Sequence, residues 1–465
     1  MSSMQATSVH APTDSGFLGT RSGFASQPLD LKNPLDAFER LYGQCEHCFL
    51  LESFEQDGTL GRYSYLGFNP ETLLHIKDGV IRVGTEEREE DPFSFLKTYT
   101  KTSDRQGFRG GLVGYLSHDA VRYVEDFKPK RGSFADMEFG LYLDGIVFDH
   151  LQHTARYVTA GNDRMDELQR LLRETKDAEI GLSENAQGST MNAQVFEPFV
   201  KQDAFSESVM KAQERIAAGD AFQIVLSRKF PVRVHGSKMP FYRKLRQTNP
   251  SPYQYFLKMG KREIIGSSPE MLVRVENQTA TTFPIAGTRP RGRTPQEDTQ
   301  LEADLKADPK ENAEHAMLVD LARNDIGRVC KPGTVQVSSY GQVKKFSHVQ
   351  HLVSEVSGQL FGTSTDALKS VFPAGTLTGA PKLSALKIID QLEPQPRGPY
   401  GGAVGFLSLD GSCDFAISIR TLFCDGDTAF VQAGAGIVKD SDPISEFRET
   451  EYKAQALLQC LKNEE

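Results

Sequence analysis

The chain has 465 residues, of which 38% are hydrophobic and 25% charged, and its formal net charge is −9. This length favours two domains or one large composite domain, and no apolar run approaches the roughly 20 residues that span a bilayer. Because the charge is acidic and mixed along the chain, no basic stripe is available for nucleic-acid phosphates, and we expect neither a nucleic-acid nor a membrane partner.

Residues 1–30 are rich in Ser, Ala, Thr and Gly, which predicts a disordered N-terminal tail. A transit peptide would hold more arginine than the single Arg21, although a targeting role stays open. The six cysteines do not show the spacing of a disulfide framework, and the sequence shows no signal-peptide pattern. Both observations favour a reducing, cytoplasmic location. Cys45 and Cys48 form a CxxC that lacks the second pair a zinc site would need, so a structural role is favoured over metal or redox chemistry.

Between residues 31 and 190, short apolar runs alternate with Gly and Asp turns, which predicts a β-rich N-terminal domain. These runs are RYSYLGF, HIKDGVIRV, GGLVGYLSHD and EFGLYLDGIVFDH. Helical spacing of apolar residues after residue 163 predicts a helix there. The polar stretch that follows it places a domain boundary near residue 190, with a second domain over 191–465.

The second region opens with an amphipathic helix over 203–220 and a strand over 221–234, and it continues with strands and helices in no regular βαβ order. The fold class predicted for the whole chain is therefore α+β. One internal similarity stands out: GGLVGYLSHD (110–119) and GGAVGFLSLD (401–410) agree at seven of ten positions. Related sheets in the two halves and chance convergence on a Gly-rich hairpin both explain it.

Two helices are predicted to begin with an Asp cap followed by Pro, at 308–309 and at 442–443. Each then carries two glutamates three residues apart on one face, Glu311 and Glu314 in the first and Glu446 and Glu449 in the second. Like charges side by side are unfavourable, and two such pairs suit a Mg²⁺ ion held by a few oxygens, water and a substrate anion. Solvated helix faces, and a capping box closed by Glu311, are the alternatives.

Anion binding is indicated by stretches in which glycines expose backbone N–H groups, namely FPIAGTRPRG (283–292), GGAVG (401–405) and QAGAGIV (432–438). Ordinary tight turns are the alternative. Arg420 ends a strand, where it is either a carboxylate clamp or an exposed arginine. No Ser-His-Asp order, P-loop or dinucleotide fingerprint occurs, so we expect no nucleotide cofactor.

Taken in order, the stretches PIAGTRPRG, EHAMLVDLARNDIGRVC, VQHLVSEVSG, FPAGTLTGAPK, GGAVGFLSLDG, SIRT and VQAGAGIVKDSDPISEFRETEYKA resemble the chorismate-utilising enzymes. More narrowly, they resemble the large (component I) subunits of anthranilate synthase. The resemblance is dense over 200–458, and LLES, GRYSYLG and GYLSHDAVRY extend it toward the N-terminus. It implies two facing antiparallel β-sheets flanked by helices, and conversion of chorismate and ammonia to anthranilate and pyruvate, the first committed step of tryptophan biosynthesis.

The same resemblance assigns roles to residues. It implies Glu314 and Glu449 as Mg²⁺ ligands, with Glu311 and Glu446 beside them, Glu270 as the general acid for the departing hydroxyl, and His351 as the group assisting elimination. The chorismate dianion would be held by Gly287, Thr288, Thr378, Tyr400, Arg420, Gly434, Ala435, Gly436 and Lys453. A carboxylic acid can donate near neutral pH only if burial or neighbouring negative charge raises its pKa.

Two positions at which this chain differs from other members of the family restrict which nucleophile can attack the ring. Relatives that make aminodeoxychorismate carry a lysine where this chain has Ala286, and relatives that make isochorismate or salicylate carry a lysine where it has Gln223. An alanine cannot attack the ring and a glutamine cannot activate water, so the entering nucleophile should be ammonia. No cysteine lies in a GxCxG glutaminase motif, so the resemblance implies a glutamine amidotransferase partner in a heterodimer or heterotetramer.

Feedback inhibition by L-tryptophan is also implied, at a site to which the N-terminal region contributes. Its residues would be Leu51, Glu52, Ser53, Asn249, Pro252 and Tyr253. Gln254 stands where these enzymes usually have Met, which would alter one wall of the effector site. Three hypotheses follow: an anthranilate synthase subunit, which the residues favour, an aminodeoxychorismate synthase with an atypical turn, and a catalytically silent regulatory relative, which would have no physical reason to keep this acid, arginine and histidine set.

Overall fold

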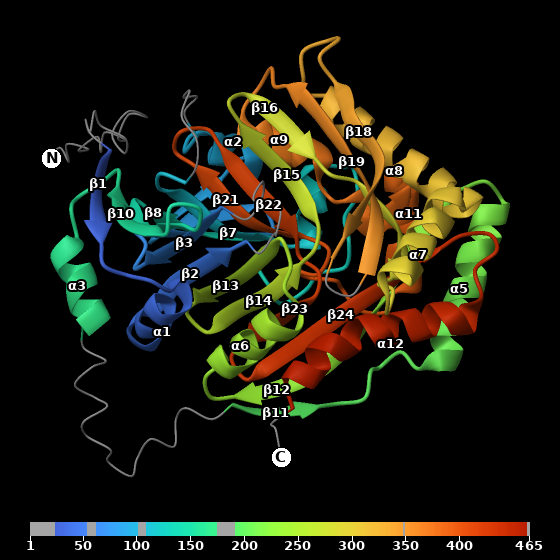
Figure 1. The fold of residues 1–465 in the computed structure, drawn as a ribbon, viewed down its shortest axis with the longest axis horizontal. Coiled ribbons are helices and arrows are strands. Elements are labelled where there is room, and N and C mark those ends of the chain that lie inside the picture. The colour runs from blue at the N-terminus through green and yellow to red at the C-terminus, as the bar shows by residue number, and fades with distance from the viewer. Residues whose placement is uncertain (1–23, 54–61, 101–107, 174–190, 347–348, 463–465) are drawn as a thin grey trace, which may run out of the picture.

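A computed structural model describes residues 24–53, 62–100, 108–173, 191–346 and 349–462 (Figure 1). Within these ranges the chain forms two antiparallel sheets, each of 12 strands. The first sheet runs β1 (Ala25–Leu29), β10 (Thr154–Thr159), β9 (Asp144–Asp149), β3 (Tyr63–Phe68), β2 (His47–Glu52), β13 (Tyr253–Met259), β14 (Arg262–Ser268), β23 (Thr421–Asp425), β24 (Thr428–Ile437), β12 (Gln223–His235) and β11 (Asn192–Val195), and β20 (Gly379–Ala380) pairs with β12.

The second sheet runs β17 (Ile285–Pro290), β19 (Val349–Gln359), β16 (Thr279–Thr282), β15 (Met271–Glu276), β22 (Cys413–Ile417), β21 (Ala403–Ser408), β7 (Gly111–Leu116), β8 (Met137–Tyr142), β4 (Thr72–Lys77), β5 (Val80–Val83) and β6 (Glu86–Glu89), and β18 (Gln336–Lys345) pairs with β19. The helices are α1 (Pro34–Gln44), α2 (Pro92–Lys97), α3 (Met165–Arg173), α5 (Gln202–Ala217), α6 (Met239–Thr248), α7 (Pro295–Ala307), α8 (Pro309–Gly327), α9 (Ser364–Val371), α10 (Gly375–Thr378), α11 (Lys382–Leu392) and α12 (Pro443–Cys460), with a 3₁₀ turn at His118–Tyr123. The prediction of an α+β fold with two antiparallel sheets flanked by helices is confirmed.

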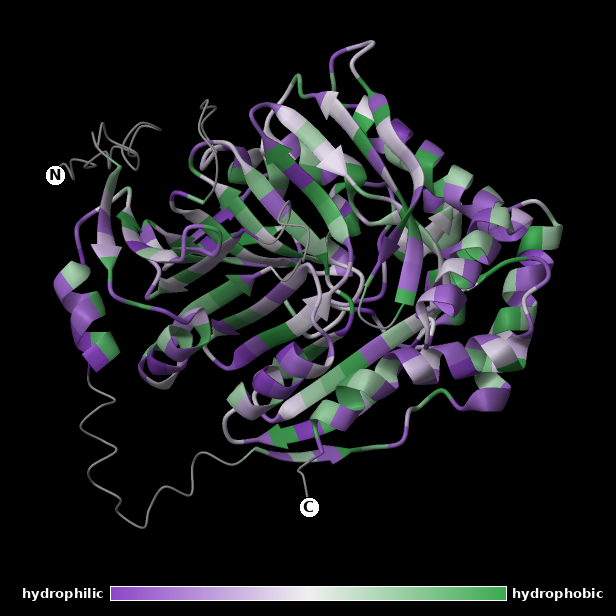
Figure 2. Ribbon diagram, in the orientation of Figure 1, coloured by the Kyte–Doolittle hydropathy of each residue, from purple (hydrophilic) through white to green (hydrophobic). Residues whose placement is uncertain are grey.

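The main core lies where the two sheets pack on each other. Apolar side chains of the first sheet, such as Tyr255 and Phe423, share one buried cluster with Tyr115 and Phe415 of the second. A separate cluster covers the outer face of the first sheet, where α1, α6 and α12 pack. The strands read as alternating or fully apolar runs because their faces are buried in these layers (Figure 2).

Both sheets combine strands from either side of residue 190. In the first sheet β2 pairs with β13, and in the second β7 pairs with β21. The division of the chain into domains at that point stays a prediction, and the sheets themselves are continuous across it. Within the predicted N-terminal tail, residues 25–29 are not disordered: they form β1, because pairing with β10 supplies backbone hydrogen bonds that composition does not reveal. Residues 1–23 lie outside the described residues.

The repeated sequences at 110–119 and 401–410 are neighbours in space. Their strands, β7 and β21, lie side by side in the second sheet, with Gly114 directly opposite Gly405. A Cβ at either glycine would lie 2.0 Å from a carbonyl oxygen of the next strand, that of Glu138 or of Asp414. The same local constraint therefore acts on both segments. None of the helices in the described ranges is long and apolar enough to cross a membrane.

Candidate active site

A cavity of about 550 Å³ is lined by strands of both sheets together with α8, α10 and α12. It brings together thirteen residues that the sequence analysis singled out as site residues: Glu270, Gly287, Thr288, Glu311, Glu314, His351, Tyr400, Arg420, Gly434, Gly436, Glu446, Glu449 and Lys453. Ala286 and Gln223 line the same cavity. Segments separated by more than 200 residues in the sequence thus meet at one place, which we call the substrate cavity.

Two of the expected residues do not line the substrate cavity. Ala435 lies between two glycines of β24, and since alternate residues of a strand face opposite sides, its methyl group packs into the cluster behind the sheet. The Thr378 hydroxyl is buried and donates a hydrogen bond to the carbonyl of Ala374 at 3.0 Å. Its neighbour Thr376 faces the cavity instead.

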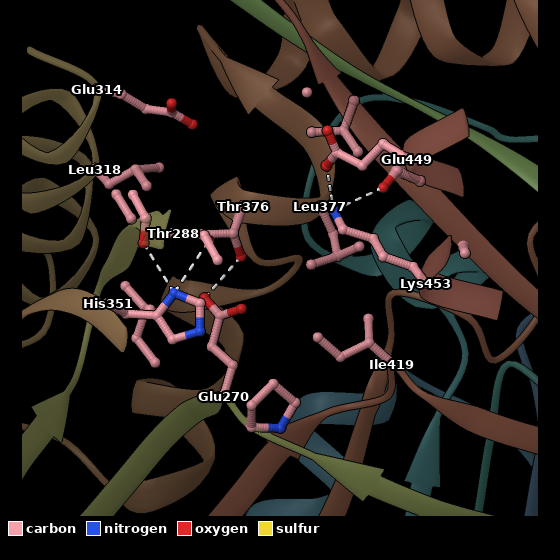
Figure 3. A pocket seen from close by; sticks show the side chains of 18 of the residues that line it. Glu270, Thr288, Glu314, Leu318, His351, Thr376, Leu377, Ile419, Glu449 and Lys453 are labelled. Carbon is pink, nitrogen blue, oxygen red and sulfur yellow. Dashed lines mark hydrogen bonds and ion pairs between the residues drawn. The ribbon is translucent and has the colours of Figure 1, made fainter. Parts of the chain in front are cut away.

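The two capped helices form as expected. Asp308 accepts the backbone N–H of Lys310 at 2.9 Å, and Asp442 accepts that of Ser445 at 2.8 Å. Each helix then directs its glutamates toward the cavity, so that Glu314 and Glu449 approach it from opposite walls (Figure 3). Local capping therefore sets the carboxylates in place.

Each carboxylate also has a polar partner within the protein. Gln223 donates to Glu314 at 2.8 Å, the Lys453 ammonium lies 2.7 Å from Glu449, and Arg289 lies 3.0 Å from Glu311. Glu311 thus pairs with an arginine and closes no capping box. Burial, with a contribution from Glu449, raises the pKa of Glu446.

The described residues hold no cluster of three or more acidic, His or Cys side chains arranged as a ready metal site. Mg²⁺ does not require one, because it usually takes one or two carboxylates and completes its octahedron with water and substrate oxygens. The facing positions of Glu314 and Glu449 suit that donor set.

The turn at 283–292 becomes part of β17. Gly287 has a φ of 64°, and a Cβ there would come within 2.9 Å of Leu305 Cδ1, so the position requires glycine. A register shift between Ala286 and Thr288 marks the same point. The Gly287 carbonyl is turned toward the ring of His351.

His351 and Glu270, for which the resemblance implies proton transfer, both line the cavity. His351 Nδ1 lies 2.8 Å from the Gly287 carbonyl and 3.1 Å from Thr288 Oγ1 (Figure 3). A carbonyl can only accept, so Nδ1 carries the hydrogen and Nε2 keeps a free lone pair. Burial lowers the pKa of His351, which favours this neutral form. The imidazole is therefore set up as a base.

Burial favours the protonated form of Glu270, whereas it favours the neutral, unprotonated form of His351. Burial raises the pKa of Glu270 to about 7, although a hydrogen bond from Thr376 and the charges of Lys453 and Arg420 act the other way. The Thr376 hydroxyl donates to Glu270 Oε1 at 2.9 Å. A carboxyl group with such a pKa can hold a proton near neutral pH and release it to a leaving group.

Several lining residues were missed by sequence reasoning, among them Thr376, Leu377, Ile419 and Gln432. Thr376 belongs to the quoted stretch 372–382, but the one-turn helix α10 directs it, and not Thr378, to the cavity. A helical reading of that stretch would have separated the two threonines.

A second cavity, of about 530 Å³, lies between the sheets and is called here the inter-sheet cavity. Leu51, Glu52, Ser53 and Tyr253 line it, as expected for the effector site, and Tyr65, Phe108, Phe406 and Arg109 join them. Asn249 and Pro252 are not among its lining residues. Asn249 Oδ1 instead lies 3.5 Å from Nη1 of Arg420, a residue that lines the substrate cavity.

Glu52 and Gln254 both line the inter-sheet cavity, but the polar ends of their side chains bond to α6 and to Asn249 just after it. The Glu52 carboxylate accepts from Tyr242 at 2.8 Å and from Arg246 at 3.0 Å, both on α6. Gln254 is the direct cross-strand partner of Glu52, so the two side chains share that outer face. The Gln254 amide accordingly lies 3.4 Å from the Asn249 carbonyl at the end of α6. The exchange of Met for Gln therefore alters the face under α6.

The fold and this site define a class of enzyme. Residues 46–459 match the family of chorismate binding enzymes, and the chain belongs to that family.

Among its relatives, the anthranilate synthase component 1 of Methanothermobacter marburgensis is 46% identical over 94% of each chain. That of Streptomyces coelicolor is 43% identical over 94% of this chain and 88% of the relative. The crystal structure of anthranilate synthase component I from Streptococcus pneumoniae superposes with a TM-score of 0.76 at 37% identity, covering 92% of this chain and 98% of the other.

Proposed function

We propose that the chain is the large subunit of an anthranilate synthase, which converts chorismate and ammonia to anthranilate and pyruvate at the start of tryptophan biosynthesis. The observation that carries the proposal is the composition of the substrate cavity. It combines Glu270 and His351 with Ala286 and Gln223, so the proton-handling pair is present while both lysines of the other chorismate branches are missing. Ammonia needs no base to activate it, and it fits such a cavity.

The substrate would be held by charge. Chorismate carries two carboxylates, and the cavity offers Arg420, Lys453 and the backbone of Gly434 and Gly436. Lys453 already spans from Glu449 to the Gly434 carbonyl, at 2.7 and 3.0 Å. Mg²⁺ held by Glu314 and Glu449, with Glu311 and Glu446 beside them, would neutralise the ring carboxylate of chorismate.

The reaction then divides between the two proton-handling residues. Ammonia bonds to C2 of the ring, while the protonated carboxyl of Glu270 gives its proton to the C4 hydroxyl, which leaves as water. The free Nε2 of His351 would assist in removing the C2 proton as pyruvate is expelled, while the enolpyruvyl CH2 carbon gains a proton and becomes the methyl group of pyruvate. Ammonia enters uncharged, so no residue has to activate it.

A partner would supply that ammonia. All six cysteines are buried and unpaired, which leaves none of them exposed as a glutaminase nucleophile. We therefore propose a glutamine amidotransferase subunit in a heterodimer or heterotetramer. Buried free thiols are also consistent with the cytoplasmic location expected from the sequence.

L-Tryptophan is proposed as the ligand of the inter-sheet cavity. Its walls are aromatic, and two of its buried polar atoms, Ser53 Oγ and Arg109 Nε, have no hydrogen-bond partner among the described residues. Buried polar atoms without partners are costly, so a ligand that carries both an aromatic ring and charged groups would satisfy them.

The test is to incubate the purified chain with chorismate, Mg²⁺ and ammonium at raised pH and to follow anthranilate fluorescence, with aminodeoxychorismate formation as the control. Anthranilate is the expected product, and aminodeoxychorismate alone would overturn the assignment. Turnover with glutamine by the chain without any partner would contradict the partner, and activity unchanged by millimolar L-tryptophan would contradict the effector.

A further inference from the structure

A small cavity of about 50 Å³ lies behind Glu270, on the side away from the substrate, and is called here the back cavity. Glu270, Thr376 and Leu318 line both it and the substrate cavity. Its other lining residues include Asp325, near the end of α8. The proposed reaction assigns no role to Asp325 or to its partner Lys382.

Asp325 is a buried carboxylate that is satisfied on one side alone. Its Oδ2 lies 2.9 Å from the Lys382 ammonium, which also donates to the Val371 carbonyl at 3.2 Å. Its Oδ1 is buried without a hydrogen-bond partner in the part of the chain that the structure describes, and the residue is 4% exposed. An unpaired oxygen on a buried charged group is costly unless water or a ligand meets it.

The back cavity has room for that water. One buried water needs roughly 10–15 Å³, and this cavity is larger, with the polar side chains of Asp325, Glu270 and Thr376 among those that line it. Phe283, Leu321 and Ala322, which also line it, are partly exposed, so the cavity approaches solvent.

The proposed reaction creates a need for a proton at this place. It is balanced overall, because nitrogen entering as ammonia loses one proton after bonding to C2 and the C4 hydroxyl gains one as it leaves. The two events occur at different carbons, and Glu270 donates the proton that the C4 hydroxyl gains. It must regain one in each turnover, before the next C4 hydroxyl can leave.

We propose that the back cavity holds water that returns a proton to Glu270, and that Asp325 is the carboxylate that holds this water and relays the proton. This inference rests on the proposed function. In the step, a cavity water gives a proton to the Glu270 carboxylate and takes one from the carboxyl group of Asp325. Asp325 then takes a proton from solvent. Asp325 acts on the reaction through Glu270 and does not touch the substrate.

The charges around the relay are compatible with it. Lys382 faces Asp325 directly, and Arg328 and Glu125 act on it from farther away, whereas Arg420 and Lys453 act on Glu270. Burial raises the pKa of Asp325 and of Glu270 alike, so each carboxyl group binds a proton more readily than it would in water.

The test compares Asp325→Asn and Asp325→Ala with the unaltered chain, in the ammonium assay and in H₂O and D₂O. The asparagine keeps the size of the side chain and a polar contact with Lys382. We expect a lower melting temperature, because Lys382 loses its buried carboxylate partner, but an unchanged chorismate KM, a kcat lowered about tenfold or more, and a larger solvent isotope effect. Formate, added to Asp325→Ala, should restore kcat, whereas formamide, which has the same size but no carboxyl group, should not.

Asp119→Asn is the matched control, because Asp119 is also buried with an unpartnered Oδ1 but lines a cavity that Glu270 does not reach. Its kcat and isotope effect should stay unchanged. Full kcat in Asp325→Asn, or equal rescue by formate and formamide, would overturn the relay. Anthranilate formation by the unaltered chain is measured in the same assay, so its absence would instead overturn the proposed function.

Discussion

The substrate cavity and the inter-sheet cavity have nearly the same volume, about 550 and 530 Å³, but they differ in charge and in construction. Five glutamates line the first, and four arginines line the second. The first is bounded by helix starts, strand ends and tight turns, whereas the second is bounded largely by strand interiors whose aromatic side chains face the opposite sheet.

This difference explains what each cavity can do. Helix starts and glycine turns expose backbone N–H groups, which can bind an anion. The first turns of the helices also carry carboxylates that can bind a cation, so the cavity suits a reaction on a dianion. Strand interiors offer a fixed aromatic slot with a few polar atoms, which suits recognition without reaction. If that division is right, changes in the two cavities should affect different measurements.

The largest effect is expected from Glu449→Gln. Removing a carboxylate that would hold Mg²⁺ should lower kcat/KM for chorismate by about 4 kcal/mol, or roughly 10³-fold. The side chain is 45% exposed, so the melting temperature should not change. Anthranilate fluorescence and thermal unfolding would measure the two quantities.

Glu451→Gln is the control for that variant, because Glu451 lies on the same helix and is 50% exposed outside the cavity. It should keep full activity. A loss of stability in Glu449→Gln that matches its loss of activity would mean that the carboxylate is structural and would weaken the distinction between the cavities.

Glu270→Gln should lower kcat by about 10²-fold, because glutamine cannot donate the proton. In the unaltered chain the carboxyl must be protonated to act, and its pKa is about 7, so kcat/KM at constant free ammonia should fall as the pH rises through that value. The variant should lose this dependence. If kcat/KM of Glu270→Gln still falls as the pH rises through about 7, another group must be the acid.

The same variant has a signature in stability. Burial raises the Glu270 pKa from 4.5 to about 7, so the folded chain binds this proton more tightly than the unfolded chain. Its contribution to stability is complete below pH 4.5 and is lost as the pH rises through about 7. Glu270→Gln should therefore melt higher than the unaltered chain at pH 8, with a smaller difference at pH 5.

A change in the inter-sheet cavity should instead affect inhibition. Arg109→Gln removes a charged donor whose Nε bonds to none of the described residues, and it should weaken L-tryptophan binding by about 2 kcal/mol, or roughly 30-fold, with kcat unchanged. Calorimetric titration would measure the affinity. The exposed Arg82, replaced by Gln, serves as control. Equal losses of affinity in both variants would remove Arg109 from the site.

The sequence predicted the substrate cavity better than the inter-sheet cavity, for a physical reason. The cap at Asp308, the pair Glu311 and Glu314, and the glycine turn are each encoded within a few residues, so local rules recover them. The walls of the inter-sheet cavity come from strands whose pairing is set at long range, such as β2 with β13. Thr378 and Ala435 were misplaced because a motif identifies a stretch of chain and does not say which side chain faces inward.

The smallest effect is expected from Gln254→Met, which restores the residue usual in these enzymes. Because Gln254 shares the outer face with Glu52, the change should leave L-tryptophan affinity within about threefold. Gln254 is 1% exposed and its Oε1 has no partner, so methionine removes a buried unsatisfied oxygen and should stabilise the fold by about 1 kcal/mol. Denaturant unfolding and titration with L-tryptophan measure the two values. A tenfold change in affinity without added stability would mean that the side chain at position 254 contacts the bound ligand. The separation between the strand face that binds and the face that packs under α6 would then be wrong.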